Sequence, residues 1–263
     1  MATVTVITNN KGGVAKTTTA VNLSASLRLQ GFDVLCIDMD GQCNLTETLG
    51  VDTSTVQGTT YDTLKKRNAP YVQPVRVLPS GKGVGVLDVL PSERDMFAGE
   101  VMLANEPDRV TRFAAVVDGY RDKYDVILID TTPTIGLLSI SALYAADNAI
   151  ITTNPDYLAN RGLVSVRDII NDVNRNRPAP LGYKVLFCKY DKRKGLHRLT
   201  VEQVRAAFPT FATVVRDNVA LSEAPAAHTD IFRYAPRSYG AQDYEAIAAE
   251  YVKAYRLRHR KHK

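Results

Sequence analysis

The sequence contains no tryptophan, only three cysteines and no long uninterrupted run of apolar residues. A membrane-spanning helix needs about 20 mostly apolar residues, so the lack of such a run excludes one. The first residues, MATVTVIT, also lack the basic stretch and apolar segment of a secretory signal, and we expect a cytoplasmic protein. Cys36, Cys43 and Cys188 do not have the spacing of metal ligands. Cys36 and Cys188 lie in apolar, strand-like runs, which predicts that both are buried.

The composition is otherwise that of an ordinary globular protein, and the excess of positive charge is local. Of the 263 residues, 45% are hydrophobic and 23% are charged, which suits one well-buried α/β domain. The formal net charge is +5, and five basic side chains lie in the final stretch RLRHRKHK, so the rest of the chain is formally neutral. We expect a single domain over residues 1–255 and a basic C-terminal tail over residues 256–263.

Short apolar runs rich in β-branched residues alternate along the chain with longer segments of helical periodicity. This alternation is typical of crossover units that build a parallel sheet. The inner runs are apolar at every position, as a sheet covered by helices on both faces requires. We therefore predict an α/β fold with a doubly wound, mostly parallel sheet. The predicted strands are residues 4–8, 34–38, 85–90, 125–130, 149–153, 184–190 and 213–216.

A glycine loop, KGGVAKTT, lies between the first predicted strand and the first predicted helix. Backbone N–H groups around Gly12 and Gly13 can point at an anion, and the helix dipole adds positive potential. Lys16 is expected to contact the β- and γ-phosphates of a nucleotide, and the Thr17 hydroxyl to ligate Mg²⁺. Ala15 occupies the second glycine position of the usual phosphate-loop pattern, so the loop alone also fits a glycine turn without a ligand.

Three aspartates end two of the predicted strands. Asp38 and Asp40 lie in VLCIDMDGQCN, and Asp130 lies in YDVILIDTTPT. Ligands of open parallel sheets bind outside the carboxyl ends of the strands, so these acids are expected to converge on the glycine loop. Asp130 is predicted to hold Mg²⁺ through its water shell, as the acid that ends an apolar strand does in nucleotide hydrolases. Asp40 is predicted to orient the attacking water, with a water-mediated contact to the metal as a further role.

Four ordered blocks resemble the ParA family of partition ATPases, within the MinD/ParA group of P-loop ATPases with a deviant Walker A motif. The blocks are KGGVAKTT, IDMDGQCNLT, YDVILIDTTPTIGLLSISAL, and VVRDNVALSEAP followed by YAPRSYGAQDY. The similarity runs from Val4 to about Tyr251 and is to the short type without an N-terminal helix-turn-helix domain. It implies a P-loop NTPase fold, ATP and Mg²⁺ as cofactors, and weak intrinsic hydrolysis of ATP to ADP and phosphate.

The resemblance also implies roles for individual residues of the nucleotide site. In that family the lysine at the Lys11 position crosses into the other subunit of an ATP-sandwiched homodimer and touches its phosphates. Lys11 thus joins Lys16 and Asp40 as a catalytic residue, in the manner of an arginine finger supplied in trans. Asn218 matches a position near the adenine. The residues at the family's nucleotide-binding positions are Lys11, Gly12, Gly13, Val14, Ala15, Lys16, Thr17, Thr18 and Asn218.

A DNA-binding role is likewise implied by the resemblance. The ATP-bound dimer of such proteins binds DNA without sequence preference, and a ParB-like partner stimulates hydrolysis and release, which implies a nucleoid-associated protein. Arg193 matches one DNA-contacting position, but Ala220 stands where close relatives carry another arginine. The residues expected to bind DNA are Arg193, Lys192, Lys194, Arg198 and Arg216, with Arg233, Arg237 or the tail as further compensation for Ala220.

The catalytic blocks depart from the family at two positions. Ala15 replaces the usual glycine, but alanine keeps its N–H donor and needs only an allowed backbone angle, so the phosphate grip is expected to survive. Gly41 replaces the usual proline after Asp40, which removes a fixed φ and is expected to loosen this segment and slow turnover.

Other functions remain open alternatives at this stage. A MinD-like membrane ATPase shares the site, although the C-terminal VKAYRLRHRKHK offers only a thin apolar face for a bilayer. ParA-like ATPases also position cargo other than DNA. An ATP-driven reductase like the nitrogenase iron protein would need cysteines for an iron–sulfur cluster, and Cys43 has no partner for one. A scaffold that binds ATP without hydrolysis is disfavoured by the presence of Lys11, Asp40 and Asp130 together.

Overall fold

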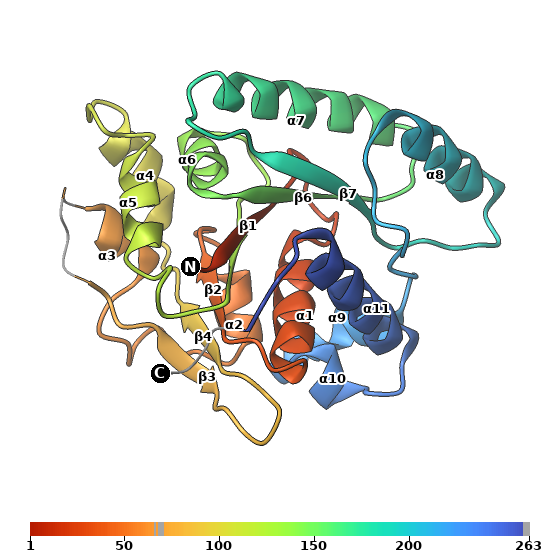
Figure 1. The fold of residues 1–263 in the computed structure, drawn as a ribbon, viewed down its shortest axis with the longest axis horizontal. Coiled ribbons are helices and arrows are strands. Elements are labelled where there is room, and N and C mark those ends of the chain that lie inside the picture. Colours follow the sequence, from red (N-terminus) through yellow and green to blue (C-terminus); the bar gives the residue numbers. More distant parts are fainter. Residues whose placement is uncertain (66, 68–70, 260–263) are drawn as a thin grey trace.

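The structure, a computed structural model, describes residues 1–65, 67 and 71–259. The strands in these residues are β1 (Thr3–Thr8), β2 (Val34–Asp38), β3 (Val75–Leu78), β4 (Leu87–Leu90), β5 (Val126–Asp130), β6 (Asn148–Thr153) and β7 (Gly182–Phe187). They form one sheet in the order β3-β4-β2-β5-β1-β6-β7 (Figure 1). β3 runs antiparallel to β4, and every other neighbouring pair is parallel.

Helices cover both faces of this sheet. They are α1 (Lys16–Leu29), α2 (Asn44–Thr48), α3 (Thr60–Leu64), α4 (Met96–Leu103), α5 (Arg112–Asp118), α6 (Leu137–Ala145), α7 (Ala159–Asn174), α8 (Gly195–Ala207), α9 (Val219–Glu223), α10 (Ile231–Tyr234) and α11 (Tyr239–Ala254). Helices α1 and α11 pack together on one face, while α4 to α7 cover the other (Figure 1).

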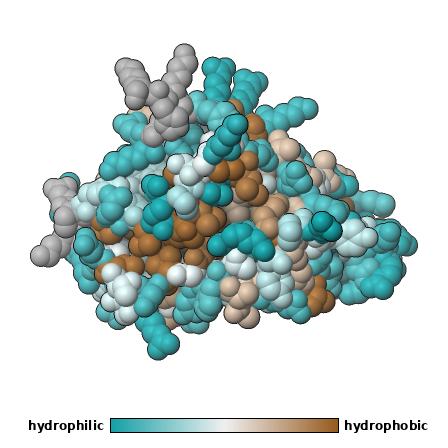
Figure 2. Space-filling view, turned by 90° about the horizontal axis from the view of Figure 1, so that it is seen from below, coloured by the Kyte–Doolittle hydropathy of each residue, from teal (hydrophilic) through white to brown (hydrophobic). Residues whose placement is uncertain are grey.

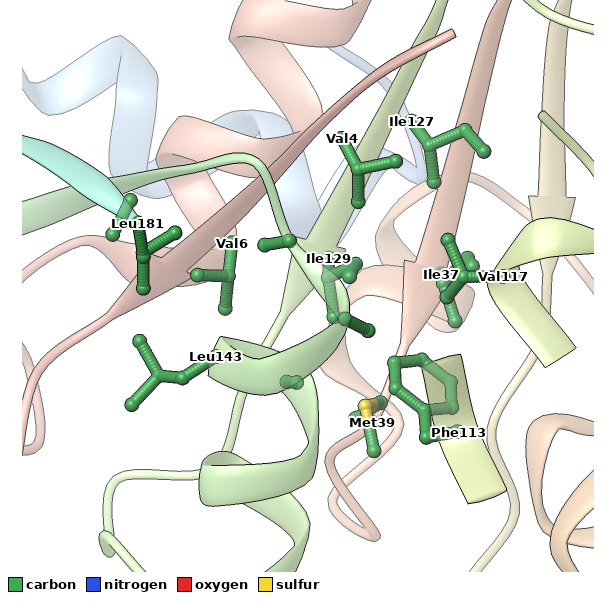
Figure 3. Close-up of a cluster of buried hydrophobic side chains, with 14 of the residues drawn as sticks. Val4, Val6, Ile37, Met39, Phe113, Val117, Ile127, Ile129, Leu143 and Leu181 are labelled. Atoms are coloured by element: carbon green, nitrogen blue, oxygen red, sulfur yellow. The ribbon is translucent and has the colours of Figure 1, made fainter. Parts of the chain in front are cut away.

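The core is split into two apolar layers because successive side chains of a strand point to opposite faces. In β5, Ile127 and Ile129 belong to the layer beneath α4 to α7, and Val126 and Leu128 belong to the layer beneath α1 and α11. Figure 3 shows the first layer, with strand side chains such as Ile129 facing α5 and α6. The predicted doubly wound, mostly parallel fold is therefore confirmed.

The predicted strands are present near the expected residues, with one exception. The predicted strand 213–216 is wrong, because this segment only touches the edge of β7. The N–H of Phe211 donates to the C=O of Val185 (2.9 Å), and the N–H of Val215 donates to the C=O of Phe187 (2.8 Å). Between these two bonds the segment advances four residues while β7 advances two, so no regular ladder can form.

The edge strand β3 was not predicted. Its sequence, VRVL, is short and half-exposed, and Arg76 interrupts the apolar pattern. The guanidinium of Arg76 forms an ion pair with the buried carboxylate of Asp88 on β4. β3 is therefore held in place by a contact with β4, and the pattern of apolar residues within β3 does not predict this contact.

Two further sequence expectations can be compared with the structure. Cys36 and Cys188 are fully buried, as predicted, and Cys43 is buried as well. Within the described residues, none of the helices combines the length and apolar character needed to cross a bilayer. Seen from below, hydrophobic side chains gather near the middle of the surface and hydrophilic side chains surround them (Figure 2).

Candidate active site

Hydrogen bonds of Asn9 hold the glycine loop between β1 and α1 in a fixed shape. The side chain of Asn9 is buried, its Nδ2 donates to the C=O of Thr152 on β6 (2.6 Å), and its Oδ1 accepts from the N–H of Lys11 (3.1 Å). Gly13 and Ala15 have positive φ angles of 71° and 64°. For alanine this left-handed conformation costs about 1 kcal/mol, and the loop keeps it although a side chain has replaced the usual glycine hydrogen.

Lys16 and Thr17 stand at the start of α1, where the loop N–H groups and the helix dipole favour an anion. Lys16 is buried, and its Nζ turns back to donate to the C=O of Lys11 (3.2 Å). Burial lowers the pKa of Lys16, while the charges of Asp130 and Asp40 oppose that shift. The hydroxyl of Thr17 donates to Oδ2 of Asp130 (2.6 Å). The loop thus presents a cation and a hydroxyl to the same space.

Asp130 lies opposite this space because β5 is flanked by β1 and β2. Its register partners are Ile7 on β1 and Asp38 on β2, so the carboxyl ends of three strands meet here. Burial raises the pKa of Asp130 to about 8, with the charge of Asp38 adding to the shift and Thr17 opposing it. Its Oδ1 is buried and accepts no hydrogen bond within the described residues.

These residues fit a magnesium ion that is shared with phosphates. Mg²⁺ keeps several waters and usually takes one or two protein oxygens together with substrate phosphate oxygens. The hydroxyl of Thr17 supplies one such oxygen, and the free Oδ1 of Asp130 can accept a hydrogen bond from a water of the metal. Nowhere in the described residues do three or more His, Cys, Asp or Glu side chains gather in a way that could hold a metal. Thr17 and Asp130 therefore suit a metal that also takes phosphate oxygens.

Asp38 and Asp40 are both buried at the end of β2, but their hydrogen bonds separate their roles. Oδ1 of Asp38 accepts from the N–H of Asp40 (3.0 Å), and its Oδ2 accepts from the N–H (3.0 Å) and the hydroxyl (2.7 Å) of Thr46. Burial raises the pKa of Asp38 to about 6. Asp40 uses only Oδ1, which accepts from the N–H of Gln42 (3.0 Å). Asp38 thus fixes the segment, and Asp40 keeps an oxygen available for a water molecule.

The side chain of Lys11 has its partner outside the glycine loop. Its Nζ forms an ion pair with the carboxylate of Asp156, and both side chains are partly exposed. Sequence reasoning did not identify Asp156. The available signal was an acid three residues after the predicted strand 149–153.

Asn218, which is expected to lie near the adenine, lines a cavity together with residues of the loop and of α1. It caps α9, with its Oδ1 accepting from the N–H of Ala220 (3.0 Å). A small cavity of about 40 Å³ lies between Asn218, Ala15 and Thr18. A larger cavity of about 230 Å³ adjoins Thr17 and Thr18 on the side of Pro225. The larger of these two cavities does not include Asn218 in its lining.

Three of the residues expected to bind DNA, Lys192, Arg193 and Arg216, line a cavity of about 560 Å³. Arg193 is highly exposed and pairs with Asp191 (2.9 Å), and Arg216 pairs with the buried Asp243 (2.5 Å). The Arg193 hydrogen bonds hold the pKa of Asp191 well below its usual range. Both arginines of this surface are therefore paired with aspartates.

Arg198 and Lys194 lie next to this cluster, whereas the start of the C-terminal tail does not. Arg198 on α8 donates to the C=O of Lys192 (2.7 Å), and Lys194 precedes the first turn of that helix. The start of the predicted tail lies elsewhere, because the ring of His259 stacks on Phe32 with centroids 4.1 Å apart. Phe32 precedes β2, so His259 lies near the amino ends of the parallel strands, whereas the phosphate loop lies at their carboxyl ends. Arg260, Lys261 and Lys263 lie outside the described residues.

The anion-binding loop at the start of α1, facing acids at the ends of β2 and β5, defines the class of the protein as a P-loop ATPase. A family model described as an AAA domain matches residues 2–182. Sporulation initiation inhibitor protein Soj of Bacillus subtilis is 36% identical over 255 residues, which are 95% of this chain and 98% of Soj. Chromosome partitioning protein ParA of Myxococcus xanthus is 34% identical over 250 residues, which are 94% of this chain and 87% of that protein.

The same class appears among solved structures. Cobyrinic acid a,c-diamide synthase from Mycobacterium smegmatis, solved with a bound ATP analogue and magnesium, is 26% identical with a TM-score of 0.80. The match covers 97% of this chain and 96% of that one. The chain therefore belongs to the ParA family of P-loop ATPases, and its cofactors are ATP and Mg²⁺.

Proposed function

We propose that this ATPase is a partition or positioning protein that forms a homodimer around two ATP molecules, binds DNA without sequence preference in that state, and is released by hydrolysis. The observation that carries the proposal is that the two loop lysines face different partners. Nζ of Lys16 turns back into its own loop, whereas Nζ of Lys11 leaves the loop for Asp156 at the surface. A lysine that serves the phosphates of a second subunit must be able to point outward, as Lys11 does.

Hydrolysis in this proposal uses the residues that meet at the carboxyl ends of the strands. Lys16 and the loop N–H groups hold the β- and γ-phosphates, and Thr17 and Asp130 hold Mg²⁺, which supplies charge neutralisation when bound. Asp40 orients a water whose oxygen bonds to the γ-phosphorus. The bond from that phosphorus to the bridging oxygen breaks, a proton of the attacking water passes to an oxygen of the new phosphate, and the products are ADP and phosphate. Lys11 of the partner subunit stabilises the charge that develops on the phosphates.

The DNA surface of the dimer is proposed to be the basic cluster around Arg193, with Lys192, Lys194, Arg198 and Arg216. Each phosphate that such a cluster neutralises releases condensed counterions, so affinity should fall steeply with salt. Arg193 and Arg216 are already paired with carboxylates, so DNA phosphates must replace these partners. A single cluster therefore binds weakly, and a dimer with two copies gains affinity through effective concentration. This gain supports an ATP requirement for DNA binding.

The same proposal includes the partner and the location. Slow intrinsic hydrolysis preserves the DNA-bound state until a ParB-like activator accelerates it. The protein would then be cytoplasmic and nucleoid-associated, with a single ATPase domain over residues 1–255 and a basic tail over residues 256–263. Cargo other than DNA, carried by the same cycle, is the alternative that the gene next to this one would decide.

A membrane-binding function of the MinD type is less well supported. The bulky apolar residues of the C-terminal segment that could enter a bilayer are Val252, Tyr255 and Leu257. All three pack against the core layer beneath α1 and α11. Inserting them into lipid would require this packing to break, which favours DNA over a bilayer as the surface that the dimer binds.

Replacing Lys11 tests the dimer directly. Lys11→Ala should bind ATP as a monomer and fail to dimerise, because its charge is needed only across the interface. Asp156→Ala is the matched control, since it removes the surface partner of the lysine but leaves the lysine, and it should still dimerise. The measurement is the molecular mass in solution by light scattering after size-exclusion chromatography with ATP, in an Asp40→Ala background that prevents turnover. A Lys11→Ala protein that dimerises like its parent would reject the in-trans role.

A further inference from the structure

The segment that carries Asp40 is packed against an aromatic ring from another part of the chain. Gly41 lies under Phe97 in the first turn of α4, and a Cβ built on Gly41 would lie 2.9 Å from Cδ2 of Phe97 and 3.0 Å from its Cγ and Cε2. At 2.9 Å, a Cβ on Gly41 would require the ring of Phe97 to move. The ring of Phe97 therefore occupies the space that any side chain at position 41 would need, although the residue is 56% exposed overall.

Helix α4 is itself anchored to the loop that follows Asp130. Met96 and Leu103 are buried in the core layer beneath this helix. Oε1 of Glu100 accepts from the N–H of Leu138 at the start of α6 (3.3 Å), and the carboxylate of Glu100 fills the space where a side chain on Gly136 would lie. Two side chains of α4 thus occupy the spaces that side chains at two glycines would need. One glycine follows Asp40, and the other lies in the loop that leads from Asp130 to α6.

We propose that Phe97 is a positioning residue for ATP hydrolysis: its ring restrains the backbone of Gly41 and thereby the carboxylate of Asp40. The inference rests on the proposed role of Asp40. The N–H of Asp40 is fixed by Asp38, and its Oδ1 is fixed by the N–H of Gln42. These two bonds act together only while the Gly41 backbone between them keeps its shape. Glycine gives the chain no restraint of its own at this point, and the ring supplies it from outside.

Removing the ring should slow the reaction without weakening nucleotide binding. Phe97→Ala is expected to lower kcat by about tenfold, because a misplaced catalytic group loses rate steeply with small displacements. The Kd for ATP should be unchanged, since the phosphates are assigned to Lys16 and the loop, and the proposal places Phe97 against Gly41. Phe97→Tyr keeps the ring and should restore kcat. Val101→Ala, one turn further along α4 and 78% exposed, is the matched control and should behave like the parent.

A second variant approaches the same contact from the other side. Gly41→Ala places a Cβ in the space of the ring and should push Phe97 outward, which lowers kcat to a similar extent. In the Phe97→Ala background the same change has no ring to displace and should cause no further loss. The double-mutant cycle of kcat values therefore predicts strong non-additivity, which two unrelated structural defects would not produce.

The experiment measures kcat, ATP affinity and thermal unfolding for this set, with Asp40→Ala measured beside it. Loss of kcat at constant Kd, restored by tyrosine and non-additive with Gly41→Ala, supports the proposal. An unchanged kcat in Phe97→Ala, additive losses, or an equal loss of ATP affinity overturns it while leaving the proposed function intact. Full turnover in Asp40→Ala would instead remove the assignment of Asp40, and the role of Phe97 with it.

Discussion

Lys16→Ala should weaken ATP binding by at least about 100-fold, because each hydrogen bond to a charged group contributes about 1.5–3 kcal/mol and Lys16 faces two phosphates. The folded protein without nucleotide should be no less stable. Burial lowers the pKa of Lys16, which means that the folded state disfavours its charged form, and alanine removes that penalty. Titration of ATP, followed by calorimetry and by the shift of Tm on adding ATP, measures both quantities.

Lys65→Ala is a useful comparison, because it removes the charge of an exposed lysine that pairs with Asp62 outside the phosphate loop. It should keep most of the nucleotide-dependent rise in Tm, whereas Lys16→Ala should lose it. If Lys16→Ala retained ATP affinity and dimerised with ATP like the parent, the assignment of the phosphate loop would be wrong.

Asp40→Ala should lower kcat by roughly 10²–10⁴-fold, the range contributed by a positioned acid or base. ATP binding and dimer formation should persist, because Asp40 is assigned to the attacking water and the phosphates are held by Lys16 and the loop. Asp40→Asn refines the test. Its side-chain oxygen can still accept the hydrogen bond from Gln42, so the segment keeps its shape while the carboxylate charge is lost.

Single-turnover hydrolysis and equilibrium ATP binding, measured on the same samples, separate chemistry from affinity. Both variants should trap the ATP-bound dimer. A variant that lost affinity and turnover in parallel would show that Asp40 holds the nucleotide, and the division of roles between Asp40 and Lys16 would fail.

The convergence of Asp38, Asp40 and Asp130 on the glycine loop could be predicted because it depends only on the strands being parallel. In a parallel sheet, residues that end adjacent strands must meet at one edge, whatever the details of packing. The alternation of short apolar runs with longer segments of helical periodicity likewise predicted most of the strands. The hydrogen bonds from Thr46 that hold the carboxylate of Asp38 could not be predicted, since they depend on how the chain folds back after β2.

Contacts between distant segments were missed for the same reason. Asp156 reaches Lys11 from the end of β6, and Phe97 reaches Gly41 from α4. Neither pairing leaves a periodic signal in the sequence. The segment 213–216 has a strand-like composition but meets β7 with a mismatched number of residues, and only the three-dimensional path shows this.

The central claim is that ATP converts a weak basic contact into firm DNA binding through dimerisation. The most direct measurement is a gel-shift titration on several unrelated duplexes with ATP, with ADP and without nucleotide, together with sedimentation of the protein with anionic liposomes. Arg193→Ala should weaken binding on every duplex and reduce its salt dependence. Arg175→Ala is the matched control, because Arg175 is another highly exposed arginine paired with an aspartate.

The account predicts binding that is much tighter with ATP than with ADP or without nucleotide, similar for all duplex sequences, and absent from liposomes. Equal DNA affinity in the three nucleotide states, or ATP-dependent sedimentation with liposomes but no DNA binding, would contradict it.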